Sequence, residues 1–153
     1  MTREAKLMSG IILITVPSIQ YGGYFLLSSL MNKSSGYMDN PLRQNFFRAG
    51  HAHAGVIVIL SLVCQVLADG AQLPYGVLWL ARVGVPLAAI LLPLGFFLSM
   101  PSPTATEPNG MVSLIYVGIF VLAASVLTLG IGLVRAAMTT YANVACNAVS
   151  RSV

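Results

Sequence analysis

Charged side chains are scarce in this sequence, and their scarcity excludes most classes of soluble protein. Only 8% of the 153 residues are Asp, Glu, Lys or Arg, whereas 57% are hydrophobic. A chain of this composition has too few polar side chains to cover an apolar core, so its outer surface must face lipid. The sequence therefore predicts an integral membrane protein whose principal partner is the bilayer.

Acidic residues and cysteines are few as well. The four acidic residues stand apart from one another, which argues against acid–base catalysis by paired carboxylates. The two cysteines, Cys64 and Cys146, lack the paired spacing of a disulfide framework or a zinc cluster. The eight basic residues are scattered near the ends of apolar segments, and phosphate binding needs several together, so nucleic acid is not an expected partner.

Long apolar segments dominate the rest of the chain. A helix rises about 1.5 Å per residue, so about 20 apolar residues cross the ~30 Å hydrocarbon layer. We predict an all-α bundle of four transmembrane helices that forms a single domain, residues 1–153. The spans are expected at about residues 7–30, 50–67, 77–100 and 111–134, with a polar loop at 31–49, a turn or helix start at Asn40-Pro41 and a tail at 136–153.

The distribution of basic residues favours one orientation. Four spans place both termini on one side of the membrane, and the positive-inside preference narrowly favours cytoplasmic termini in the cell (plasma) membrane. The basic start followed by an apolar run also resembles a signal peptide. That run continues to Leu30 without a convincing small-residue cleavage site, so we expect a retained first span.

The only two histidines, His51 and His53, stand where the second span is expected to begin. Ionisable groups at that depth are costly and form a functional hypothesis by default. Two residues apart on a regular helix, they point about 200° apart and cannot bind one metal ion, although they could converge if the helix began only after His51. His53 projects toward an apolar side of the span, where a neutral imidazole suits a haem iron. The alternative is that both hydrogen-bond loop carbonyls near the headgroups.

The step Ala52-His53-Ala54, followed by the apolar run that begins at Val56, carries a family resemblance. This step follows a first span that contains Gly and Tyr, a long loop, and a segment of basic and aromatic residues that leads into the second helix. Over about residues 8–70 the sequence resembles the N-terminal part of the catalytic subunit I of the haem-copper oxidase superfamily. In that family a histidine opening the second helix is an axial ligand of the low-spin haem, so the resemblance implies this role for His53. The family's other ligands lie on later helices that this chain lacks, and no histidine follows His53. A complete oxidoreductase in this chain alone is therefore not expected.

Two classes of function follow from these patterns. One is a haem-binding membrane protein for electron transfer, haem handling or gas sensing, with His53 and His51 as candidate metal ligands and a homo-oligomer or another membrane subunit as partner. In it, Arg43 and Arg48, one to three turns before His53, would bind the haem propionates; lipid phosphates are the alternative. The other class is a cofactor-free structural or accessory membrane subunit.

One ion pair is also expected within the bundle. Arg82 lies about six residues into the third span, and Asp69 lies at the end of the second. A short hairpin would bring them to similar depth, so we predict that they pair; the alternative is that Arg82 extends to the interface.

Overall fold

The fold, a computed structural model, is described for the backbone of residues 1–150 and the side chains of residues 1–141. This part of the chain contains four long helices and no strand: α1 (Arg3–Met31), α2 (Pro41–Ala68), α3 (Tyr75–Ser99) and α4 (Ser113–Ser150). Two short 3-10 turns, η1 (Lys33–Ser35) and η2 (Gly110–Val112), lie in the loops that precede α2 and α4. Each long helix has the length and composition to cross a membrane. The predicted all-α bundle of four membrane-spanning helices is confirmed.

The start of α2 is set by local sequence. The side chain of Asn40 accepts a hydrogen bond from the Arg43 N–H at 3.0 Å, and Pro41 occupies the first helical position, where its missing N–H costs nothing. The helix therefore begins at residue 41, which confirms the helix start expected at Asn40-Pro41, and it extends before the apolar span expected from about residue 50. Much of the predicted polar loop is thus the first turns of α2.

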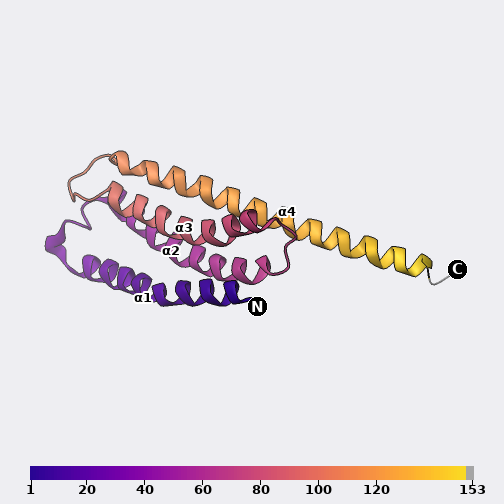
Figure 1. The fold of residues 1–153 in the computed structure, drawn as a ribbon. Coiled ribbons are helices and arrows are strands. Elements are labelled where there is room, and N and C mark those ends of the chain that lie inside the picture. The colour runs from indigo at the N-terminus through magenta and orange to yellow at the C-terminus, as the bar shows by residue number, and fades with distance from the viewer. Residues whose placement is uncertain (151–153) are drawn as a thin grey trace.

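The end of α4 also differs from the expectation. Residues 133–150 contain neither Gly nor Pro, so nothing in the sequence breaks the helix where a tail was predicted. Figure 1 shows α4 extending past the ends of the other three helices. The side chain of Cys146 and all of Arg151–Val153 lie outside the described residues.

The helices pack as a central pair flanked on both sides. α3 packs against both α2 and α4, whereas α1 packs mainly against α2 (Figure 1). Glycines allow the backbones of α3 and α4 to approach closely. There is no room for a Cβ at two of them: one on Gly84 would overlap Ser125 Oγ, and one on Gly118 would come within 2.8 Å of Leu92 Cγ. In lipid, where hydrophobic burial does not drive helix association, such close packing stabilises the bundle.

The outer surface of the bundle is apolar. Ile14, Phe120 and Leu127 expose 80%, 74% and 66% of their surfaces. Apolar exposure along every helix would be unfavourable in water and is what a bilayer requires. The protein is accordingly a multi-pass membrane protein. α1 packs least against the rest of the protein: only 6% of its most apolar stretch is buried by other parts of the chain, against 44% for α3.

Candidate functional site

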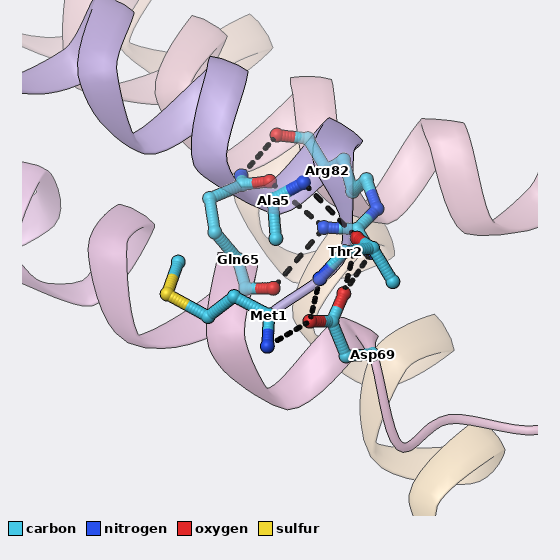
Figure 2. A network of polar contacts seen from close by, with 6 residues as sticks. All are labelled: Met1, Thr2, Ala5, Gln65, Asp69 and Arg82. Atoms are coloured by element: carbon cyan, nitrogen blue, oxygen red, sulfur yellow. Dashed lines mark hydrogen bonds and ion pairs between the residues drawn. The ribbon is translucent and has the colours of Figure 1, made fainter.

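At the end of the bundle that carries the N-terminus, a buried arginine joins three helices (Figure 2). Arg82 of α3 is 2% exposed, and its Nη2 lies 2.6 Å from Oδ1 of Asp69, the residue that caps the C-terminus of α2. The structure thus contains the ion pair between Asp69 and Arg82. The guanidinium reaches toward the end of α2 but stays buried, and its charge is neutralised there by Asp69.

Gln65 completes the surroundings of Arg82. Pro86 has no N–H to donate to the carbonyl four residues earlier, which is that of Arg82, and Gln65 Nε2 donates to this carbonyl instead at 2.7 Å. In return, Arg82 Nη1 donates to the Gln65 carbonyl at 3.1 Å, one of the last carbonyls of α2, which helix geometry leaves without a partner. A cation at this helix end is also favoured by the helix dipole. The carbonyl that Pro86 leaves without a helical donor and the side-chain amide of the buried Gln65 therefore satisfy each other's hydrogen-bonding needs.

Asp69 connects the same network to α1. Its two carboxylate oxygens accept hydrogen bonds from the Thr2 N–H and hydroxyl, both at 2.7 Å, and Thr2 Oγ1 in turn caps α1 by accepting from the Ala5 N–H at 3.2 Å. Burial of Asp69 raises its pKa, but the hydrogen bonds from Arg82 and Thr2 outweigh burial and lower the pKa to about 2. The carboxylate is therefore ionised at neutral pH and joins α1, α2 and α3.

The histidines lie toward the opposite end of the bundle, on different sides of α2. α2 is helical from Pro41, so the pair cannot converge on one metal ion in the way that a helix beginning after His51 would allow. Within the described residues, no group of three or more His, Cys, Asp or Glu side chains could hold a metal ion. Each histidine must therefore be considered separately.

His53 lies at the edge of the lipid-facing side of α2. Its Nδ1 lies 2.7 Å from the Ala49 carbonyl oxygen, and its ring stacks on Phe96 of α3 at 5.1 Å between centroids. Because a carbonyl only accepts, this contact requires the proton on Nδ1, so that in the neutral imidazole Nε2 is the nitrogen with the lone pair. The side chain is exposed, and Val56 and Ile59, each 65% exposed, follow it along the helix.

His51 faces α1 and lines a groove. Its ring lies against the Gly22-Gly23 backbone, since a Cβ on Gly23 would be 3.3 Å from both Cε1 and Nε2 of His51. From this contact a groove of about 500 Å³ runs between α1, α2 and α3. Its walls are mainly apolar, with Ile12 and Ile19 on α1, Val58 on α2 and Leu94 on α3.

The two arginines expected to bind propionates have different surroundings. Arg43 donates from Nε to the Met100 carbonyl at 3.0 Å and from Nη2 to the Pro101 carbonyl at 3.3 Å, and its guanidinium lies 4.7 Å from the centre of the Phe47 ring. Arg43 therefore ties α2 to the end of α3. Arg48 is exposed and donates only to Gln44 Oε1, at 3.2 Å, within the described residues.

Arg48 belongs to the His51 side of α2. Five residues separate it from His53, a rotation of about 140°, whereas three residues separate it from His51, a rotation of about 60°. The structure thus brings Arg48 nearer to the face of His51 than to that of His53, whereas Arg43 is held at the end of α3.

Sequence reasoning missed several residues of these two regions. Gln65 could have been found, because a glutamine in an apolar span is unusual and Pro86 leaves the Arg82 carbonyl without its helical partner. Tyr37, in the loop before α2, is 1% exposed, and its hydroxyl has no hydrogen-bond partner among the described residues. Burial raises the pKa of Tyr37 despite the nearby Arg48 and Arg43. No pattern in the sequence indicated this position.

The chain matches no protein-family model, no curated protein and no solved structure.

Replacing Asp69 with Asn should destabilise the protein by about 3 kcal/mol, because the charge of Arg82 would be left buried without a counter-ion. The stability that the lowered carboxyl pKa supplies is present above the ordinary value of 3.8 and is lost as pH falls toward about 2. The parent protein should therefore lose stability over that interval, and the Asp69→Asn variant should lack this component. Unfolding titrations with SDS in mixed micelles at several pH values measure both effects.

Asp39 provides the matched control, because it is an exposed carboxylate in a loop and no hydrogen bond or ion pair of its side chain occurs in the described residues. Asp39→Asn should leave the unfolding midpoint equal to that of the parent protein within experimental error. Equal stability of the Asp69→Asn variant and the parent would contradict the structural role of the pair.

Proposed function

We propose that this protein is an integral membrane haem-binding protein, related to subunit I of the haem-copper oxidases, in which His53 is an axial ligand. The orientation of the His53 imidazole carries the proposal. A metal-binding histidine typically donates its other ring N–H to a carbonyl or carboxylate, which fixes the tautomer and aims the free nitrogen. His53 has this arrangement, with Nδ1 at 2.7 Å from the Ala49 carbonyl. Haem bound there would supply one-electron chemistry or a gas-binding iron, which suits electron transfer, haem handling or gas sensing.

The surroundings of His53 fit one side of a haem and leave the other side to a second surface. Phe96 stacks on the imidazole and holds its plane, and the exposed Val56 and Ile59 offer apolar area for a porphyrin edge. His51 is not part of this arrangement, because its ring is turned toward Gly22-Gly23 of α1. Arg48 is rotated about 140° from His53, and Arg43 donates to the Met100 and Pro101 carbonyls, so the proposal rests on His53 without them.

A second copy of the chain is the partner that fits best. Copies inserted with the same orientation are related by a twofold axis along the membrane normal, the simplest closed symmetry. Such an axis places the two His53 side chains at the same depth on facing surfaces. Each copy would then supply one imidazole for the iron, and the lipid-facing sides of the two α2 helices would provide the apolar surface for the haem.

The haem proposal is tested by the optical spectrum of protein purified from haem-replete cells. We expect a Soret band with one haem for every two chains, because each copy supplies one ligand. His53→Ala should lose the band, and added imidazole should restore it by replacing the missing ligand. A colourless parent protein, or a band indifferent to His53→Ala, would contradict the proposal and favour a cofactor-free structural or accessory membrane subunit.

We also propose that the protein lies in the plasma membrane with its termini in the cytoplasm. The loops that carry Ser34 and Ser102 lie at the same end of the bundle, opposite the N-terminus, and both serines are exposed (Figure 1). The basic residues of the terminal side support this orientation. In a background without Cys64 and Cys146, the variants Ser34→Cys and Ser102→Cys should each react with a membrane-impermeant maleimide on intact cells. Reaction only after permeabilisation would reverse the orientation.

A further inference from the structure

The last helix, α4, carries a line of large apolar side chains on the side that faces away from the bundle. Starting from Phe120, these residues follow one another at intervals of seven, four, three, four and three positions, and each exposes more than half of its surface. We call this set the outer stripe, and it consists of Phe120, Leu127, Ile131, Val134, Met138 and Tyr141. Alternating steps of three and four residues are the heptad spacing by which two helices pack along one seam.

Helix rotation places the outer stripe opposite the surface by which α4 packs on α3. Leu127 is two residues, or about 200° of rotation, from both Ser125 and Leu129, which are 0% and 3% exposed. Ser125 lies directly against Gly84 of α3. The side chains that hold α4 in the bundle and those of the outer stripe therefore occupy different sides of one helix.

The helix is too long for the bilayer alone. α4 contains 38 residues, about 57 Å of helix, whereas the hydrocarbon layer is ~30 Å thick. The loop between α2 and α3 marks the end of the bundle, because the Gln72 N–H donates to the Gly132 carbonyl at 3.0 Å and Thr139 Oγ1 donates to Gln72 Oε1 at 2.9 Å. From there the backbone continues as a helix to Ser150, and Figure 1 shows no other helix beside this extension.

The extension is poorly suited to face water alone. Residues 136–150 contain no Asp, Glu, Lys, Arg or His. A helix of about 15 residues without tertiary contacts is marginal in water, and Met138 and Tyr141 expose 69% and 79% of their surfaces there. Lipid can cover the outer stripe within the membrane, but it cannot cover the part that extends beyond the bundle. That part requires a protein surface.

The charges favour a second copy of this chain as that surface. Copies inserted with the same orientation bring identical stripes together in parallel, and the outer stripe contains no Asp, Glu, Lys, Arg or His, so pairing places no like charges face to face. Arg135 directly follows Val134 and flanks the seam. In a parallel pair it lies opposite the partner residue five positions earlier, which is Gly130, and the glycine leaves room for the arginine side chain.

The area of the outer stripe matches that of a stable pair. Phe120 and Tyr141 expose 74% and 79% of their surfaces, and aromatic side chains of this kind bury about 150–250 Å² each. Together with the four aliphatic members, the stripe offers roughly 800 Å² per copy, which is the contribution of one partner to a standard interface.

We propose that α4 pairs in parallel with α4 of a second copy along the outer stripe, and that the pairing shields the extension from water. The contact goes beyond the proposed haem site, because the stripe lies on α4 whereas His53 lies on α2 and stacks on Phe96 of α3. Each contact has its own twofold axis along the membrane normal, so the two together would join copies into a row.

Cysteine cross-linking of the full-length chain in its membrane tests the pairing. In a background without Cys64 and Cys146, Met138→Cys and Tyr141→Cys should each form disulfide-linked dimers on mild oxidation, because seam positions bring facing Cβ atoms within disulfide range. Thr140→Cys is the matched control: it is exposed but lies about 200° around the helix from Met138, so its dimer yield should be roughly tenfold lower. Equal yields at the three positions, or no dimer at any of them, would overturn the proposal.

Two differently tagged copies of the chain identify the partner. When both are expressed together, the cross-linked product of Met138→Cys should contain both tags and have twice the mass of one chain. A product that contains one tag and a different protein would show that another partner covers the stripe, and the proposal would be wrong.

A charge placed on the outer stripe gives a second measurement. Met138→Glu should reduce the dimer yield of Tyr141→Cys roughly tenfold, because a symmetric pair places two carboxylates face to face, whereas Thr140→Glu should leave it unchanged. Met138 is exposed beyond the bundle, so its replacement leaves the fold intact. His53→Ala should not alter the yield. A yield that falls with His53→Ala and not with Met138→Glu would assign the dimer to the haem contact and overturn the pairing of α4.

Discussion

The neutralisation of Arg82 inside an apolar bundle is the constraint on which the arrangement of the first three helices depends. A guanidinium that is 2% exposed requires both a counter-ion and hydrogen-bond acceptors, and these come from Asp69 and Gln65 of α2. Asp69 then holds Thr2 at the start of α1. One charge therefore fixes the α2–α3 hairpin and attaches α1 to it. The freed carbonyl before Pro86 is satisfied by the same glutamine, so the proline does not weaken the site.

The position of α1 explains where the groove lies. Besides the attachment through Thr2, α1 contacts the bundle at Ile12 and again where Gly22-Gly23 meets His51 and Leu26 joins the cluster around Phe47. No α1 residue between Ile12 and Leu26 is buried. The helix is thus held toward its two ends and stands away from α3 between them.

The sequence predicted the features that follow from composition and chain length. Four apolar segments of sufficient length predicted four membrane helices. The short connection between the second and third of them predicted that Asp69 and Arg82 lie close to each other. Asn40 and Pro41 marked the start of α2, because an N-cap residue followed by proline is a local signal, whereas hydropathy marks only the apolar part of the helix, from about residue 50. The groove and the separation of Arg48 from His53 required the structure. Both depend on how α1 packs against α2 and on which face of α2 is turned toward it, and neither has a local signature.

The attachment of α1 through the Arg82 network is tested most directly by the accessibility of Ala5. This residue is 0% exposed beneath the network, and the neighbouring Arg3 is exposed. In a background without other cysteines, Ala5→Cys should react slowly with a water-soluble maleimide, and adding Asp69→Asn should accelerate the reaction to the rate of Arg3→Cys, which should not change. A fast reaction of Ala5→Cys with Asp69 intact, or a rate that Asp69→Asn leaves unaltered, would contradict the central role of the ion pair.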